Sequence, residues 1–248
     1  MPKFFVTPDK ITDNKIIIDT DDVSHITRVL RLGAGDSITV CDSQGIDYEA
    51  KISEIEQKRV ICDIVEKRAS LSEPNIKVTL FQGLPKASKM EYIIQKTTEL
   101  GISEIVPVKL ARCVVKIDNK KDETKKIDRW QKISEAAAKQ SGRGIVPAIS
   151  DIMTVDEVIE KAKDFDIFFA PYECEEQKTL KEVLLSKNDV KTVGFIIGPE
   201  GGFDISEIEK LKENGIGTVT LGKRILRTET AGEAVLAMTM YEIGDINL

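Results

Sequence analysis

The sequence contains a single histidine, His25, among its 248 residues. Its four cysteines, Cys41, Cys62, Cys113 and Cys174, are far apart and form no Cys-x-x-Cys pair. Because zinc sites are built mainly from closely spaced cysteines and histidines, we expect no metal site. A serine hydrolase would have to use His25 as its base, and no Gly-x-Ser-x-Gly motif accompanies it.

Long apolar runs are also missing, and none approaches the roughly 20 residues that a membrane-spanning helix needs. The first residues, Met1–Phe5, lack the apolar run and the small-residue cleavage site of a signal peptide. Apolar residues nevertheless make up 41% of the chain, which is enough to build a buried core. We therefore expect a soluble, cytoplasmic protein with no membrane segment.

Charge is distributed unevenly along the chain. The net charge is −6, yet the segment Lys109–Val146 carries 11 Lys and Arg against 5 Asp and Glu. Because binding to phosphate depends on local rather than net charge, this segment suits contact with a nucleic acid. A solvated helix face would have the same composition, and charge alone does not choose between the two.

Residues 1–70 show the pattern of a small β-rich domain, which favours a barrel. Turn residues separate four expected strands, at Ile16–Asp19, Ser37–Cys41, Tyr48–Ile55 and Val60–Val65. One helix is expected at 21–30, where apolar residues recur at helical spacing. The polar segment Ser70–Asn75 then reads as a linker between domains.

Residues 76–248 alternate between expected strands and helices, which predicts a mostly parallel sheet covered on both faces. The strands are expected at Ile76–Gln82, Ile105–Val108, Ile167–Ala170, Val193–Ile197 and Thr218–Leu221. Four capping boxes, in which a hydroxyl and a Glu satisfy free N–H groups of the first turn, are expected to begin helices. They lie at Ser88–Glu91, Thr154–Glu157, Ser206–Glu209 and Thr230–Glu233.

Two loops carry the strongest signal for function. In Ile196–Phe203 a buried strand ends at Gly198, and two further glycines allow a ligand to approach the backbone closely. The segment Leu221–Ala231 also follows a strand and holds three cations and one carboxylate. Either loop alone would read as an ordinary turn. Together, at what should be neighbouring strand ends, they predict a ligand cleft.

These loops, Ile197–Gly202 and Leu221–Ala231, closely resemble those of the ribosomal RNA small-subunit methyltransferase E family. The similarity runs through nearly the whole chain, in the order expected. Further matching motifs are His25–Arg31, Lys89–Glu91 with Gln95–Gly101, Arg112–Cys113, Trp130, and Gln140–Arg143 with Val146–Pro147. Ser141 departs from a cysteine that we associate with some members.

The resemblance implies an α/β protein with an N-terminal PUA-like β-barrel at 1–70. It also implies a C-terminal SPOUT methyltransferase domain at 76–248 with a deep trefoil knot. Such an enzyme uses S-adenosyl-L-methionine to methylate N3 of a specific uridine in small-subunit (16S) ribosomal RNA. The expected partners are that RNA or the assembled small ribosomal subunit, and a second copy of the chain in a homodimer.

By the same resemblance, three loops near the knot hold the cofactor, with apolar walls and closely approaching backbone. The residues expected to bind it are Ala170, Pro171, Ile197, Gly198, Pro199, Glu200, Gly201, Gly202, Leu221, Gly222, Ile225, Leu226 and Thr230.

Charged residues in the second loop are the candidates for chemistry. Arg227 and Arg224 suit stabilisation of negative charge on the uracil carbonyls, because guanidinium presents a planar fork of donors. Glu229 and Glu200 are candidate bases or orienting groups. A simple ion pair between a loop Arg and a loop Glu explains the same residues equally well.

RNA contact is expected from cations and an aromatic residue outside the loops, namely Phe4, Arg28, Arg31, Arg112 and Arg143. Lys116, Arg129, Lys132 and Lys139 would extend this basic surface. A cap or core role for His25 is favoured over catalysis. Two other functions stay open: a SPOUT enzyme acting on another ribosomal or transfer RNA nucleotide, and a non-catalytic RNA-binding module.

Overall fold

A computed structural model describes residues 2–115 and 119–246, and the chain divides into two compact units. The first comprises residues up to 73 together with 138–146, and the second comprises 74–137 and 147–248. The boundary therefore falls inside the expected linker. The segment 138–146, which the sequence places in the second domain, belongs to the first because its backbone bonds to the turn before β4. The Gly45 N–H donates to the Gly144 carbonyl at 3.1 Å.

The first unit is built on a five-stranded sheet in the order β1-β3-β4-β5-β2. Its strands are β1 (Lys3–Phe5), β2 (Lys15–Ile18), β3 (Ser37–Cys41), β4 (Ile46–Ile55) and β5 (Val60–Ala69). β1 pairs in parallel with β3, and every other pair is antiparallel. Alternate residues of these strands form the core, led by Ile16, Ile18, Ile38, Val40 and Ile52.

Two elements of this unit differ from expectation. The helix expected at 21–30 is a short α-helical turn, α1 (Asp22–Ser24), continued by a π-helical turn, η2 (His25–Val29). The Leu30 N–H donates to the His25 carbonyl, five residues back, so one extra residue is accommodated in that turn. β1 was not expected because three residues are too few to show a periodic pattern. A 3₁₀ turn, η1 (Pro8–Lys10), follows it.

The second unit has a parallel sheet in the order β12-β10-β11-β6-β7-β8, with β9 also pairing β7. Its strands are β6 (Lys77–Gly83), β7 (Glu104–Lys109), β8 (Ala148–Ile149), β9 (Met153–Thr154), β10 (Ile167–Pro171), β11 (Thr192–Ile197) and β12 (Gly217–Val219). The expected parallel sheet is therefore present. From β6 the chain adds β7 on one side and later β11 on the other, so the order in which strands are added reverses beside β6.

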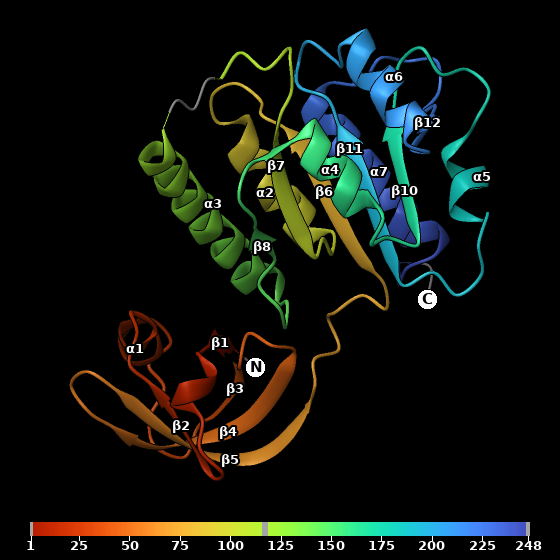
Figure 1. The fold of residues 1–248 in the computed structure, drawn as a ribbon. Coiled ribbons are helices and arrows are strands. Elements are labelled where there is room, and N and C mark those ends of the chain that lie inside the picture. Colours follow the sequence, from red (N-terminus) through yellow and green to blue (C-terminus); the bar gives the residue numbers. More distant parts are fainter. Residues whose placement is uncertain (1, 116–118, 247–248) are drawn as a thin grey trace. The chain divides into compact units, whose positions relative to one another are not determined.

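Helices cover both faces of this sheet, as expected (Figure 1). They are α2 (Lys89–Glu99), α3 (Lys120–Ser141), α4 (Val155–Ala162), α5 (Leu180–Leu184), α6 (Ile205–Glu213) and α7 (Thr228–Glu242). One core cluster joins the sheet to α2, α5 and α7, and a second joins it to α4 and α6. Among the described residues, no helix is long and apolar enough to cross a membrane.

Helix starts follow the expected capping boxes only in part. The box at Thr154 and Glu157 is present. α6 uses Asp204 and Glu207 instead, two residues before the expected pair, because the aspartate carboxylate accepts from the Ser206 N–H. Ser88 makes no side-chain cap at α2. Its expected partner, Glu91, forms an ion pair with Arg129 at 2.6 Å instead.

α7 begins at Thr228, two residues before the capping box expected at Thr230. The Thr228 hydroxyl bonds outside its own helix, to the Gly198 carbonyl, so a tertiary contact sets this start. α3 begins at Lys120. There the Asn119 side chain accepts from the Asp122 N–H, which caps a turn that carries mostly charged residues.

The first unit yields a stability prediction centred on Glu73. One carboxylate oxygen of Glu73 accepts from the Arg143 Nε, the Gly144 N–H and the Ile145 N–H, and the other accepts from Arg143 Nη2 at 2.7 Å. The Arg143 side chain is only 4% exposed. Glu73→Ala removes the carboxylate from a buried guanidinium and from two backbone N–H groups, so it should destabilise the first unit by about 3 kcal/mol.

Urea denaturation, monitored by hydrogen exchange of the backbone N–H groups in β4 and β5, measures the loss of stability of the first unit by itself. Glu56→Ala is the control, because Glu56 forms an exposed pair with Arg59 in the same unit and should change stability little. Equal effects of the two substitutions would contradict the structural importance of the Glu73 carboxylate.

Candidate functional site

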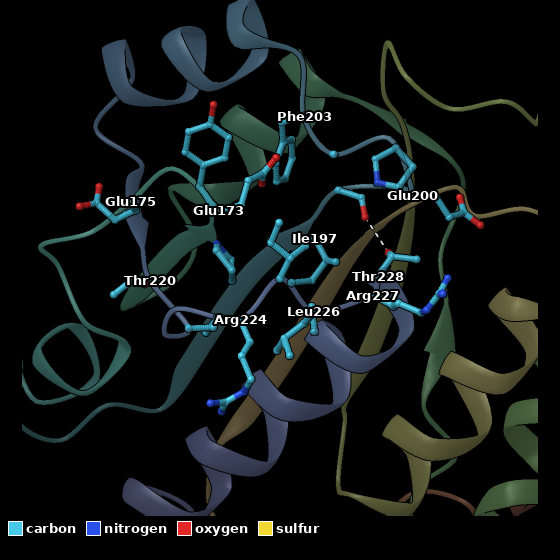
Figure 2. A pocket seen from close by; sticks show the side chains of 18 of the residues that line it. Glu173, Glu175, Ile197, Glu200, Phe203, Thr220, Arg224, Leu226, Arg227 and Thr228 are labelled. Atoms are coloured by element: carbon cyan, nitrogen blue, oxygen red, sulfur yellow. Dashed lines mark hydrogen bonds between the residues drawn. The ribbon is translucent and has the colours of Figure 1, made fainter.

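A pocket of about 1000 Å³ opens where β10, β11 and β12 end in the second unit. Parallel strands bring their carboxyl ends to one edge of a sheet, and ligands bind there in open α/β folds. The loops that follow the three strands supply most of the lining, and Figure 2 shows them converging around Ile197 and Leu226. The cleft that the two glycine-bearing loops predict is therefore present.

The loop after β11 is a tight turn formed by its glycines. The Gly202 N–H donates to the Pro199 carbonyl at 2.9 Å, and Gly202 has a φ of +68°. A Cβ at Gly198 would lie 3.1 Å from the backbone of Gly202, so a side chain there would push the two ends of the loop apart. Arg112, at the end of β7, braces the outside through its bond to the Gly201 carbonyl at 3.1 Å.

The loop after β12 is longer and forms the opposite side of the pocket. Gly222 has a φ of +97°, a backbone conformation that residues with a side chain adopt only at a cost in free energy. Leu221 and Leu226 are half-buried and can form apolar walls, whereas Ile225 is 87% exposed. In Figure 2 the side chains of Arg224 and Arg227 extend away from each other on either side of Leu226.

A buried hydrogen bond joins these two loops. The Thr228 hydroxyl, at the first residue of α7, donates to the Gly198 carbonyl at 2.6 Å (Figure 2). Both residues line the pocket and both are buried. The end of one loop is thereby fixed to the start of the other.

Lys89, in the first turn of α2, holds two carboxylates from the two loops. Its Nζ lies 3.3 Å from the Glu200 carboxylate and 3.1 Å from the Glu229 carboxylate. Contact with Glu229, and then with Glu200, raises the pKa of Lys89 although burial opposes it. Burial alone would raise the pKa of both Glu200 and Glu229, but backbone N–H groups and Lys89 outweigh it and lower both. All three groups are therefore charged at neutral pH.

The loop after β10 adds acidic side chains to the lining, from Glu173, Glu175 and Glu176. Glu175 has a structural role, since it accepts from the Thr218 hydroxyl at 2.6 Å and from two backbone N–H groups of its own turn. These bonds lower the pKa of Glu175 to about 2. Glu173 and Glu176 are exposed and remain available to a ligand.

Most residues expected to bind a cofactor are brought together in this pocket. Those that line it are Pro171, Ile197, Gly198, Pro199, Glu200, Gly201, Gly202, Leu221, Gly222, Ile225 and Leu226, together with Arg224 and Arg227. Three expected residues are absent from the lining. Ala170 is buried in the sheet core, and Thr230 is exposed on α7. Glu229 forms an ion pair with Lys89 instead.

The pocket also contains Lys89 and Thr220, which lie outside the predicted loops. Lys89 appeared only as part of a matching motif, and its place at the start of a helix that follows a strand was the available signal. Within the described ranges, no group of three or more His, Cys, Asp and Glu is arranged to hold a metal ion.

The expected RNA-binding residues divide into two groups. Arg28, Arg31 and Arg112 are exposed. Phe4 is 5% exposed and its ring contacts His25, so it does not present a face for base stacking. Arg143 is 3% exposed and bonded to Glu73, so its guanidinium serves the first unit rather than its surface. Lys116 lies outside the described residues.

Two family models match the chain. An RNA methyltransferase domain matches residues 72–240, and an RNA methyltransferase PUA domain matches residues 18–65. The ribosomal RNA small subunit methyltransferase E of Bacillus subtilis is 36% identical over 229 residues, which cover 91% of this chain and 89% of that protein.

Solved structures show the same similarity. A ribosomal RNA small subunit methyltransferase E from Neisseria gonorrhoeae, bound to S-adenosyl methionine, is 30% identical with a TM-score of 0.85 over 99% of both chains. A putative methyltransferase from Legionella pneumophila, in complex with the cofactor SAM, is 27% identical with a TM-score of 0.84, again over 99% of both chains.

Lys89 gives a pH-dependent prediction. In the wild type the pKa of Glu200 and of Glu229 lies below the ordinary value of 4.5, so their stabilising interactions are present above that pH and are lost as pH falls below it. In Lys89→Met the two carboxylates face each other without a cation, which raises their pKa. The variant should therefore lose stability as pH rises above 4.5 and both groups ionise.

We expect the melting temperature of Lys89→Met to fall several degrees below that of the wild type at pH 7.5, and this gap to shrink towards pH 4.5. Lys163→Met, which removes an exposed pair with Glu160, is the control and should show a small gap at every pH. A gap for Lys89→Met that does not depend on pH would argue against the shared clamp.

Proposed function

Because this chain belongs to the ribosomal RNA small subunit methyltransferase E family, we propose that it uses S-adenosyl-L-methionine to methylate N3 of a specific uridine in 16S ribosomal RNA. The observation that supports this most strongly is the pocket at the ends of β10, β11 and β12, where nearly all the expected cofactor residues meet. The relative bound to S-adenosyl methionine has the same fold over almost its whole length.

The pocket residues fit this cofactor. The volume of the pocket, about 1000 Å³, is at the upper end of the range for small-molecule sites, which leaves room for a target base beside the cofactor. Ile197, Leu221 and Leu226 provide apolar walls suited to an adenine ring. The tight turn at Gly198–Gly202 brings backbone donors and acceptors to the pocket without intervening side chains. When bound, the cofactor supplies an electrophilic methyl group.

Arg227 is our candidate for stabilising the charge that develops on the uracil ring. Methylation at N3 requires the loss of its proton, which places negative charge on the neighbouring carbonyl oxygens. Arg227 lines the pocket and precedes α7, so a helix N-terminus lies beside its backbone. Arg224 also lines the pocket but extends in another direction (Figure 2), which suits it to a different part of the substrate.

Of the two candidate carboxylates, Glu200 is the better placed to accept the proton. It lines the pocket, whereas Glu229 does not. Both are ionised at neutral pH because Lys89 and backbone N–H groups lower their pKa. We assign Glu229 an orienting role, in which it fixes Lys89 and through it the position of Glu200.

We propose that the sheet of the first unit is a PUA-like barrel that binds RNA through Arg28 and Arg31. The chain of the second unit forms the deep trefoil knot of SPOUT enzymes. The protein acts in the cytoplasm as a homodimer, on ribosomal RNA or on the assembled small subunit.

Two measurements test this function. Calorimetric titration with S-adenosyl-L-methionine should show binding at one site per chain, and a non-catalytic RNA-binding module would show none. Mass mapping of 16S RNA from cells with and without the protein should then show one uridine that gains a methyl group on N3 only when the protein is present. An unchanged RNA would refute the assignment.

Arg227→Ala tests the proposed chemistry. We expect kcat to fall by about a hundredfold, because removal of one donor to a developing negative charge costs that much in other enzymes. Cofactor affinity measured by calorimetry should stay close to that of the wild type. Lys191→Ala is the control, since Lys191 precedes the amino end of β11, at the far end of that strand from the pocket. Near-normal turnover of Arg227→Ala would remove this residue from the mechanism.

A further inference from the structure

Gln82 is a fully buried polar residue next to the pocket, although it does not line it. It lies near the end of β6, beside which the order of strand addition reverses, and it pairs with Ile197 of β11 and Pro107 of β7. Its neighbour on the same face of the strand is Leu80, a core residue under α7. An amide in this apolar layer is costly unless it is hydrogen-bonded.

The Gln82 amide nitrogen begins a chain of hydrogen bonds that leads to both pocket loops. Nε2 donates to the Gly83 carbonyl at 3.0 Å and to the Thr228 hydroxyl at 2.9 Å. The Thr228 hydroxyl then donates to the Gly198 carbonyl at 2.6 Å. Because Gln82 occupies a lone pair of the hydroxyl oxygen, it directs the hydroxyl proton towards Gly198. The central strand thereby orients the Gly198–Pro199 peptide and the start of α7 together.

The amide oxygen of Gln82 does not account for a glutamine at this position. Oε1 is buried and makes no hydrogen bond within the described part of the chain. It faces Gly232 of α7, where an added Cβ would lie 3.6 Å away. A buried unpaired acceptor costs free energy, and an unbranched apolar side chain of the same length would avoid that cost. The benefit of a glutamine here is therefore its amide nitrogen.

We propose that Gln82 is a positioning residue for the cofactor site, acting through Thr228 on the Gly198 carbonyl. This inference rests on the proposed function, because the ligand whose binding it affects is S-adenosyl-L-methionine. Gln82 touches neither cofactor nor RNA. Gln82 sets the position of the loop after β11 relative to the loop after β12. Both loops must be in place to form the pocket.

The test separates positioning from stability in the full-length protein. Gln82→Met keeps length and bulk, removes the donor and also removes the unpaired oxygen. We expect its melting temperature to stay within about 3 °C of the wild type. The Kd for S-adenosyl-L-methionine, measured by calorimetry, should rise about tenfold. Thr228→Val should weaken binding similarly, and Thr228→Ser, which keeps the hydroxyl, should recover most of the lost affinity.

The double variant Gln82→Met with Thr228→Val should bind no more weakly than Thr228→Val alone, because both substitutions break one chain of bonds. Thr239→Val is the matched control. Thr239 is also buried in α7, and within the described residues its hydroxyl bonds only to the Val235 carbonyl, so Thr239→Val should lower the melting temperature without changing Kd. Unchanged affinity in Gln82→Met, or additive effects in the double variant, would overturn the proposal.

Hydrogen exchange in the free protein keeps the two proposals distinguishable. If the wild type does not bind the cofactor, the proposed function fails, and exchange in 198–203 and 221–231 then decides the role of Gln82. Faster exchange of both segments in Gln82→Met, but not in Thr239→Val, would support the positioning role. Equal rates in the wild type and Gln82→Met would overturn it.

Discussion

The alignment of parallel strands is the constraint on which the pocket depends. β10, β11 and β12 all end at one edge of the sheet, so loops that are far apart in the sequence meet there. The sheet must also bring these loops close enough to form hydrogen bonds and ion pairs. At Gly83 an added Cβ would lie 2.8 Å from Pro199, so the end of β6 and the loop after β11 already touch through their backbones.

Hydrogen bonds and charges then hold the loops at this edge in two different ways. Thr228 and Gly198 are joined under the pocket, where water is excluded and a bond keeps most of its strength. Lys89 joins Glu200 and Glu229 at the rim, where solvent screens the interaction. The buried bond fixes geometry, while the rim cluster keeps Glu200 and Glu229 ionised.

Sequence reasoning identified what depends on local pattern and missed what depends on packing. Alternating strands and helices, the linker and both glycine-bearing loops were visible because each shows a period, a turn residue or a strand end. The start of α7 was wrong because the Thr228 hydroxyl leaves its helix to bond Gly198. Lys89 and Gln82 come from elements more than 100 residues before the loops they hold, and no spacing rule connects them.

The basic segment 109–146 shows the same limit for electrostatics. Several of its cations are paired with acidic residues that are distant in sequence: Arg112 with Asp204, Arg129 with Glu91, and Lys139 with Asp22. These pairs leave at least one partner well exposed and are worth little, so an RNA phosphate can replace the carboxylate at small cost. Arg143 is different, because its side chain is buried and its carboxylate partner, Glu73, also binds two backbone N–H groups. A phosphate could bind the Arg143 guanidinium only if these hydrogen bonds were broken. The RNA surface is therefore best sought among the exposed, weakly paired cations, and a count of positive charge in the sequence overstates it.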